Sequence, residues 1–160
     1  MMNGLLFVLT LLAVLGCGMM AGVFFAFSAF VMKALARLPA EQGIAAMQAI
    51  NVAAVTFAFM AALFGTALAC GALAVWALFA WDERFAPYLL VGSALYLAGT
   101  ILLTIVYHVP RNETLATMEP RSADAESYWR RYLSGWTAWN HVRAAAALAA
   151  AIAFTIALHV

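Results

Sequence analysis

The sequence predicts an all-α protein, a bundle of four transmembrane helices in which residues 1–160 form a single domain. Of the 160 residues, 68% are hydrophobic and only 9% are charged, whereas about 25% of the residues of a soluble domain carry a charge. The mean hydropathy is +0.98, and four stretches are long and apolar enough to be membrane spans. The net charge of +1 provides no basic excess to neutralise a phosphate backbone, so nucleic acid is excluded as a partner.

The first membrane span covers residues 4–32, a stretch without any charged side chain. Its helix is expected to continue to Leu38, which gives a length of about 50 Å at ~1.5 Å per residue, well beyond the ~30 Å hydrocarbon core. The second span covers residues 57–81 and ends before the polar turn Asp82-Glu83-Arg84. Its helix is expected to begin near Pro39, because proline is favoured in the first turn of a helix.

The third span covers residues 87–108 and is expected to stop at Pro110, which lacks the donor that a continuing helix needs. The fourth covers residues 140–160, and its helix is expected to begin near Ser122, with Ser or Asp as the cap. The first, second and fourth helices are therefore predicted to extend on the cytoplasmic side. The loop of residues 110–126 would then lie over the shorter third helix as a lid.

Positive charges are concentrated at the loops that follow the first and third spans. The basic residues flanking these two loops are Lys33, Arg37, Arg111, Arg121, Arg130, Arg131 and Arg143. Only Arg84 lies at the loop after the second span. By the positive-inside rule, the first and third loops are cytoplasmic and both termini lie outside. The expected location is the bacterial inner membrane, with membrane lipid as a partner.

Small residues in the spans indicate close helix contacts. The alanine runs 144–147 and 149–151 and the pattern Gly18-Met-Met-Ala-Gly22 allow helix backbones to approach each other. Packing within the bundle is favoured, and a homodimer through these small-residue faces is the alternative. Cys17 and Cys70 both lie inside apolar spans, where packing as free thiols is expected rather than a disulfide.

Polar and aromatic side chains converge toward the cytoplasmic end of the predicted bundle. The fourth helix carries one stripe, spaced by three and four residues, of Trp129, Leu133, Trp136, Asn140 and Arg143. An Asn and an Arg at this depth are costly unless they face the bundle or a wet cavity. Residues expected at a comparable depth are Ser28, Asn51, His108 and Asn112, beside an aromatic stretch of the first helix that contains Phe24. Together these groups could form one pocket for a small hydrophobic molecule.

Each of these residues also has a structural interpretation. Trp129 and Trp136 could be anchors at the membrane interface, and Arg143 could extend to lipid phosphates. Asn112 could be a turn residue after Pro110, and His108 could complement the dipole at a helix C-terminus. The aromatic residues of the first helix could simply be bundle core.

Four segments carry a resemblance to a known family. They are Gly22-Val-Phe-Phe-Ala-Phe-Ser28, Ala46-Met-Gln-Ala-Ile-Asn51, His108-Val-Pro-Arg-Asn112 and Trp136-Thr-Ala-Trp-Asn140-His-Val-Arg143. In these segments the chain resembles the small integral-membrane family of the anthrone oxygenases, and the likeness extends over nearly the whole sequence. This chain carries His108 where the family usually carries Asn.

The resemblance implies a four-helix membrane bundle that oxidises an anthrone carbon to a quinone with O2. Such a reaction needs a base, a donor that stabilises an oxyanion and a dry aromatic slot. The expected catalytic residues are His108 as the base and Asn112, Asn140 and Arg143 as donors. The expected substrate-binding residues are Phe24, Ser28, Asn51, Trp129 and Trp136. This mechanism requires no cofactor, because the anthrone anion is electron-rich enough to react with O2 directly.

Two other functions are compatible with the sequence. A redox protein would bind haem or copper through His108 and His141, which are both expected near the cytoplasmic interface. A structural membrane protein would use Asn140 and Arg143 as contacts between helices. A proton-coupled transporter is disfavoured, because the first three spans contain no carboxylate. The serine-triad, zinc, phosphate-loop and paired-carboxylate signatures are absent from the sequence.

Overall fold

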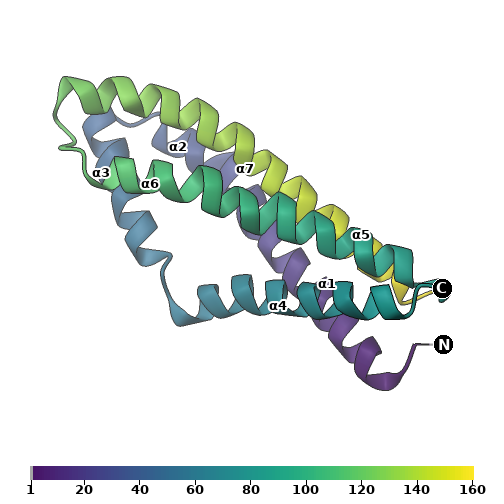
Figure 1. Ribbon diagram of the computed structural model, residues 1–160. Coiled ribbons are helices and arrows are strands. Elements are labelled where there is room, and N and C mark those ends of the chain that lie inside the picture. Colours follow the sequence, from purple (N-terminus) through teal and green to yellow (C-terminus); the bar gives the residue numbers. More distant parts are fainter. Residues whose placement is uncertain (1) are drawn as a thin grey trace.

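The computed structural model describes residues 2–160, and all regular structure in that range is helical (Figure 1). The elements are α1 (Gly4–Ala26), the π-helical segment η1 (Phe27–Val31), α2 (Met32–Leu35), α3 (Ala40–Ala53), α4 (Phe57–Phe79), α5 (Ala86–Tyr96), the π-helical segments η2 (Leu97–Leu102) and η3 (Thr104–His108), α6 (Val109–Ala116) and α7 (Ala123–Ala157).

Segments that follow each other without a break make four long apolar helices. They are Gly4–Leu35, Phe57–Phe79, Ala86–Ala116 and Ala123–Ala157. Each is long and apolar enough to cross a membrane, and the protein is an integral membrane protein. The fold class expected from the sequence, an all-α bundle of four spans, is confirmed.

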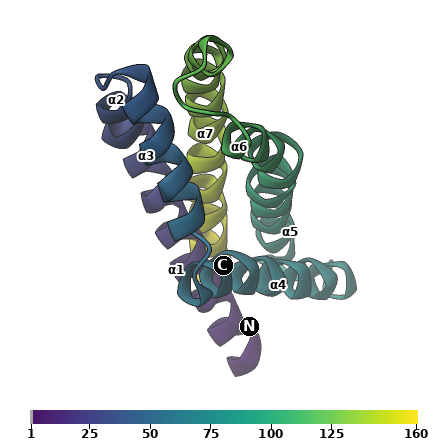
Figure 2. The ribbon, with the colours of Figure 1, turned by 90° about the vertical axis from the view of Figure 1, so that its left-hand side faces the viewer.

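The four long helices form a closed ring of contacts. α7 packs against α1 and α5, and α4 in turn contacts both α5 and α1. Both ends of the described chain lie at one end of this arrangement, while α3 and α6 lie at the other (Figures 1 and 2). We call the end that carries α3 and α6 the extended end.

Small side chains bring the spans close together. Ala147 and Ala150 of α7 are fully buried, and a side-chain carbon on Gly99 would overlap the side chain of Ala146. The expected role of the alanine run as a helix contact is therefore confirmed. The Cys17 and Cys70 thiols are free and buried, and they interact with each other between α1 and α4.

Side-chain oxygens cap the N-termini of three helices, α1, α4 and α7. Asn3 accepts a hydrogen bond from the backbone N–H of Leu6 at 2.9 Å. Ser122 does the same for Ala125 at 3.1 Å, as expected for the start of α7. Each cap satisfies one of the N–H groups that the first turn of a helix leaves without a partner.

The third long helix does not stop at Pro110, and that prediction is wrong. The chain continues as α6 to Ala116, so the predicted loop 110–126 is reduced to a short connection before α7. The reason is η3, a wider turn in which the N–H of Val109 bonds to the carbonyl of Thr104. Pro110 follows this change of register and takes the first-turn position where its missing N–H is tolerated. No lid of that length forms among the described residues.

The second long helix is broken, whereas a continuous helix from Pro39 was expected. α3 begins at Ala40 but ends at Ala53, and α4 begins only at Phe57. Thr56 has an extended backbone, and its hydroxyl accepts a hydrogen bond from Phe59 N at 3.2 Å, so it acts as a new N-cap. At this break α4 turns away from the direction of α3 (Figures 1 and 2).

The Gly18 and Gly22 pattern does not pack within the bundle, so that prediction is also wrong. No atom of the described residues outside their own helix lies within 4 Å of the position that a side-chain carbon would take on either glycine. Both glycines are exposed on α1, because the opposite face of this helix makes the contacts with α4 and α7. The alternative, a homodimer through this face, stays a prediction.

Candidate functional site

A cavity of about 490 Å³ lies where α3, α4 and the break between them face α1, η3, α6 and α7. Pockets for small molecules have volumes of roughly 300–1,000 Å³. The walls are mainly apolar, and the polar lining residues are Asn51, Thr56, Thr104, His108, Asn112 and Arg143. Two of these residues, Thr104 and His108, come from the π-helical segment η3, and π-helical turns frequently occur at functional sites.

Arg143 places a positive charge in the wall of this cavity, with only 6% of the residue exposed. Its Nη1 donates to Oγ1 of Thr104 at 3.1 Å, and its Nη2 donates to Oδ1 of Asn140 at 2.6 Å. The guanidinium carbon lies over the rings of Phe24 and Trp136, at 4.3 Å and 5.3 Å from their centroids. These two ring contacts contribute cation–π stabilisation in a desolvated position.

The charge of Arg143 has no counterion among residues 2–160. All seven acidic side chains are exposed, and two of them, Glu41 and Glu126, form ion pairs with Arg121 and Arg130. A buried charge without an ionic partner costs several kcal/mol. An anionic group in the cavity would supply the missing partner.

Asn140 does not line the cavity but accepts a hydrogen bond from Arg143 and so positions its side chain. Its Nδ2 donates to the carbonyl oxygen of Phe24 and to Oγ of Ser28, each at 2.7 Å. The Phe24 carbonyl also accepts a hydrogen bond from the backbone N–H of Phe27 where α1 passes into η1, so the bond from Asn140 uses its second lone pair. Both hydrogens of the Asn140 amide are thus used, and its oxygen fixes the Nη2 group of Arg143.

His108 faces the same cavity and is 1% exposed. Its Nδ1 lies 3.4 Å from the carbonyl oxygen of Leu103, and its ring packs edge-on against Trp136 with centroids 5.1 Å apart. The Trp136 backbone lies near this ring, but Nε2 has no hydrogen-bond partner among the described residues. With Nδ1 donating to Leu103, Nε2 carries a lone pair that can accept a proton from a ligand.

Asn112 fixes two aromatic side chains of α7. Its Oδ1 accepts hydrogen bonds from the Tyr132 hydroxyl at 2.7 Å and from Nε1 of Trp136 at 3.0 Å. The rings of Tyr132 and Trp136 are stacked, with centroids 6.2 Å apart. Asn112 is therefore a helical residue that orients Trp136 in the cavity wall rather than a turn residue.

Unpartnered polar atoms are concentrated at this cavity. The buried side-chain atoms of the described residues without a hydrogen-bond partner are Asn51 Nδ2, Ser93 Oγ, Thr100 Oγ1, His108 Nε2 and Arg143 Nε. Three of these residues, Asn51, His108 and Arg143, line the cavity. Buried polar groups in folded proteins are nearly always hydrogen-bonded, so water or a bound molecule in the cavity would have to satisfy these three atoms.

A packed apolar cluster covers the cavity toward the extended end. Its buried members are Met32, Leu35, Ile44, Met47, Leu115, Ala125, Trp129, Tyr132 and Trp136. Gln48 ties α3 across this cluster to the end of α6, because its Nε2 donates to the carbonyl oxygens of Leu115 and Met118 at 2.8 Å and 3.0 Å. The cavity is therefore closed toward the extended end and does not open there.

The structure brings most of the expected site residues together. Those that line the cavity are Phe24, Asn51, His108, Asn112, Trp136 and Arg143. Ser28 and Asn140 lie behind the wall and hold Arg143. Trp129 does not line the cavity but stacks on Tyr132 in the apolar cluster, with centroids 5.5 Å apart.

Two residues of this site were not found from the sequence. Tyr132 is buried on the stripe of α7 where Leu133 was expected, and Leu133 is half-buried. The spacings from Trp129 to Tyr132 and from Tyr132 to Trp136 are three and four residues, so the helical pattern was compatible with either residue. For Thr104, the sequence indicated no role in the site apart from its position one turn before His108.

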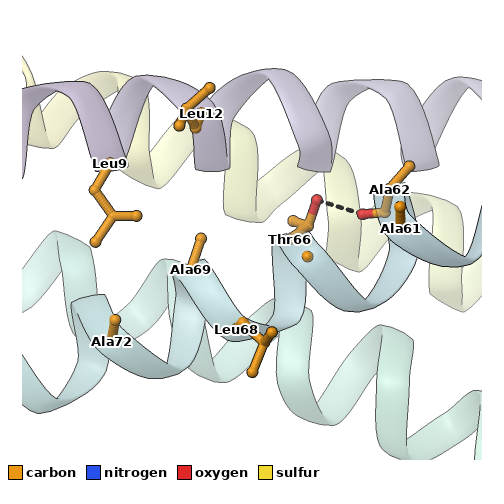
Figure 3. Close-up of a pocket in the computed structure, with 9 residues that line it drawn as sticks. Leu9, Leu12, Ala61, Ala62, Thr66, Leu68, Ala69 and Ala72 are labelled. Carbon is orange, nitrogen blue, oxygen red and sulfur yellow. Dashed lines mark hydrogen bonds between the residues drawn. The ribbon is translucent and has the colours of Figure 1, made fainter. Parts of the chain in front are cut away.

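A second groove, of about 460 Å³, lies between α1 and α4 on the side chains of Leu9, Leu12 and the small residues of α4 (Figure 3). The polar side chain in its lining is Thr66, whose hydroxyl donates to the carbonyl oxygen of Ala62 at 2.7 Å. This groove offers a ligand neither a charge nor an unpartnered donor. The chemistry of the molecule is therefore concentrated at the cavity beside Arg143.

The histidines expected to bind haem or copper lie in different environments. His108 is buried in the cavity wall, whereas His141 is exposed and does not line the cavity. Among residues 2–160, no three His, Cys, Asp or Glu side chains are grouped so that they could hold a metal ion. Haem or copper ligation by His108 with His141 is thus not supported by their positions.

The family model for anthrone oxygenases matches residues 53–153. The chain belongs to the anthrone oxygenase family. The matched range of this anthrone oxygenase family member contains His108, Asn112, Trp136, Asn140 and Arg143, whereas the contributions of α1 and α3 to the cavity precede it. A search of curated proteins and a search of solved structures each returned no significant match.

Proposed function

We propose that the protein oxidises a small hydrophobic aromatic substrate of the anthrone type with O2 in the cavity beside Arg143. The observation that carries this proposal is the buried guanidinium of Arg143, which has aromatic faces and an imidazole beside it and no carboxylate partner among residues 2–160. An anthrone that loses a proton becomes a flat aromatic anion, which matches both the charge and the aromatic walls of this site.

The first step is proton removal from the benzylic carbon. Nε2 of His108 takes this proton, and the electron pair left behind spreads over the rings onto the anthrone oxygen. Arg143 stabilises the negative charge on that oxygen, in a low-dielectric site where such a contact is worth more than in water. Asn140 does not touch the substrate in this scheme but positions Arg143, and Asn112 positions Trp136.

The second step is reaction of the anion with O2. The anion gives up its electrons to O2, a carbon–oxygen bond forms, and the resulting peroxide takes the proton back from His108. Loss of the second benzylic proton then breaks the oxygen–oxygen bond, which leaves the quinone carbonyl and a hydroxide that this proton converts to water. The balance is one substrate and one O2 consumed for one quinone and one water.

The test is turnover of anthrone by the purified protein in lipid nanodiscs, measured as O2 uptake together with anthraquinone formation. Anthrone oxidises slowly without protein, so empty nanodiscs give the background. Loss of a donor to an oxyanion lowers kcat by ~10²–10³, and a loss of that size is expected for Arg143→Met. Turnover of the wild type at the background rate would contradict the proposed function.

The same variant separates catalysis from a purely structural role of Arg143. Replacing a buried charge by an apolar side chain of similar volume removes a desolvation penalty, while the oxygen of Asn140 loses its donor, which costs about 1–3 kcal/mol. These effects oppose each other, so Arg143→Met is expected to unfold within a few degrees of the wild type. A strongly destabilised variant that keeps full turnover would instead assign Arg143 to helix packing.

The proposed location is the bacterial inner membrane, with the extended end in the cytoplasm. This orientation is supported by the basic residues that flank the first and third loops, by contrast with Arg84 alone at the second. Labelling of Arg121→Cys by an impermeant maleimide tests it, because this position is exposed and lies between α6 and α7. Only inside-out vesicles should react, and the wild type controls for the buried Cys17 and Cys70.

A further inference from the structure

The cavity has a mouth, and its rim is defined by the lining residues that are exposed. These are Ala53, Val55, Thr56 and Val109. The first three lie at or in the break between α3 and α4, and Val109 begins α6 on the facing helix. The opening therefore lies on the side of the bundle, between the break and α6, and not at its extended end.

The surface around this mouth is apolar. At the break, Val55 is 71% exposed and its neighbour Phe57 is 91% exposed. Across the mouth, Ile105 and Val106 are also exposed. Exposed apolar side chains in such density mark contact with a membrane or a partner, and here they belong to helices that span the bilayer.

The charges of the sequence place the mouth within the apolar zone. The chain has no Asp, Glu, Lys or Arg between Glu41 and Asp82, nor between Arg84 and Arg111, and the rim residues fall inside these two intervals. A break in a helix at membrane depth is tolerated where the irregular backbone lines a cavity. The break at residues 54–56 meets this condition, because all three residues line the cavity.

The route from the extended end is blocked by the apolar cluster described above. Met47 and Leu115 belong to this cluster, between the cavity and the extended end, and each is at most 1% exposed. Gln48 fixes α3 to the end of α6 through two hydrogen bonds. A ligand from the aqueous phase would have to separate this contact and displace packed side chains.

From this geometry we infer that the cavity is loaded from the bilayer, through the side opening between the α3–α4 break and Val109. The substrate is then an aromatic compound that is uncharged and lipid-soluble while free, and that becomes an anion only beside Arg143. This identification of the substrate rests on the proposed function, whereas the route rests on the position of the mouth alone.

The test uses a thiol in the cavity as a reporter of access. Leu63 lines the cavity, is buried and lies outside the proposed catalytic machinery, so Leu63→Cys places a thiol that reagents reach through the cavity. The protein in nanodiscs is treated with N-phenylmaleimide, which is uncharged and dissolves in lipid, or with a sulfonated maleimide, which stays in water. The wild type controls for Cys17 and Cys70, which are fully buried and do not line the cavity.

We expect N-phenylmaleimide to label Leu63→Cys at least tenfold faster than the sulfonated reagent, although Arg143 would attract a sulfonate. Adding Ala53→Trp at the rim should slow the labelling at least tenfold. The matched control is Ala49→Trp, one turn earlier on α3, exposed and not in the cavity lining, which should leave the rate unchanged. Thermal unfolding and gel filtration of each variant establish that it is folded.

Three outcomes would overturn the inference: equal labelling by both reagents, no slowing by Ala53→Trp, or no labelling of Leu63→Cys by N-phenylmaleimide. The result is independent of the proposed reaction. If the labelling follows the expectation but anthrone is not turned over, the route stands and the proposed function fails. If anthrone is turned over but the sulfonated reagent labels as fast, the proposed function stands and the route fails.

Discussion

Arg143 donates a 2.6 Å hydrogen bond to the side-chain oxygen of Asn140, one turn before it on the same helix. Asn140 in turn donates to Phe24 and Ser28 of the first helix. This relationship connects the buried charge of α7 to the end of α1 and to η1. The orientation of the guanidinium in the cavity wall is therefore set by two helices together, and not by the rotamer of Arg143 alone.

Asn140→Leu is expected to reduce both stability and turnover. It leaves the Ser28 hydroxyl and the Nη2 group of Arg143 without the partner that Asn140 provides, and each unsatisfied buried group costs about 1–3 kcal/mol. A displaced guanidinium should also lower kcat by ~10²-fold, because catalysis is sensitive to shifts of about 1 Å. Thermal unfolding and anthrone turnover measure the two effects. His141→Ala, at the exposed neighbouring position, should change neither, and an unaffected kcat in folded Asn140→Leu would exclude a positioning role.

His108→Asn separates the base from the rest of the site. Asparagine is polar and no larger than histidine, so it introduces no clash at this buried position and the fold should be retained. An amide cannot take the substrate proton, and loss of a general base lowers the rate by ~10²–10⁴. The expected result is normal binding of anthraquinone, measured by quenching of tryptophan fluorescence, with kcat reduced at least a hundredfold. Turnover close to that of the wild type would show that His108 is not the base.

Gly99→Ala tests the close approach of η2 and α7. The added carbon would overlap the side chain of Ala146, and an alanine has no rotamer by which to move away. Overpacking of this kind costs about 1–3 kcal/mol. Gly71→Ala is the matched control, because the space around Gly71 is open and alanine is favoured over glycine in a helix by about 1 kcal/mol. The unfolding temperature should fall for the first variant and not for the second.

The exposed face of α1 with Gly18 and Gly22 is predicted to support a homodimer. A pattern of small residues four positions apart lets two membrane helices approach closely, and here the face is not used within the bundle. Gly18→Ile is expected to weaken association, measured by energy transfer between labelled copies in liposomes, without changing thermal stability. Gly4→Ile, also in open space on α1, is the control. Association that is equal in all three proteins would contradict this interface.

Much of the fold followed from the sequence because membrane spans obey strong rules. Apolar length, the position of Pro87 and the Ser122 cap predicted four helices close to their observed limits. Two of the errors, at Pro110 and at residues 54–56, concern the backbone register within a helix. A π-helical turn before a proline and a threonine cap between two apolar stretches depend on how neighbouring helices use the freed backbone groups, and the local sequence does not contain that information.

The site was predictable in its composition but not in its division of roles. The spacing of Trp136, Asn140 and Arg143 placed them on one face, and the structure has them there. The sequence did not reveal that the Asn140 amide donates hydrogen bonds to Phe24 of α1 and Ser28 of η1. It also did not reveal that the side-chain oxygen of Asn112 accepts hydrogen bonds from two aromatic residues. These roles depend on contacts between residues more than a hundred or about twenty positions apart, which periodicity within one helix does not report.

The apolar cluster that contains Met47, Leu115 and Tyr132 also affects which solvent reaches the cavity. Bulk water is kept from the cavity on that side, while O2, a nonpolar gas, dissolves more readily in hydrocarbon than in water. On the proposed route and reaction, the membrane would serve as the common reservoir of both reactants. The rate of supply would then follow the solvent properties of the bilayer, such as its thickness and fluidity, more closely than the concentration of any compound in the cytoplasm.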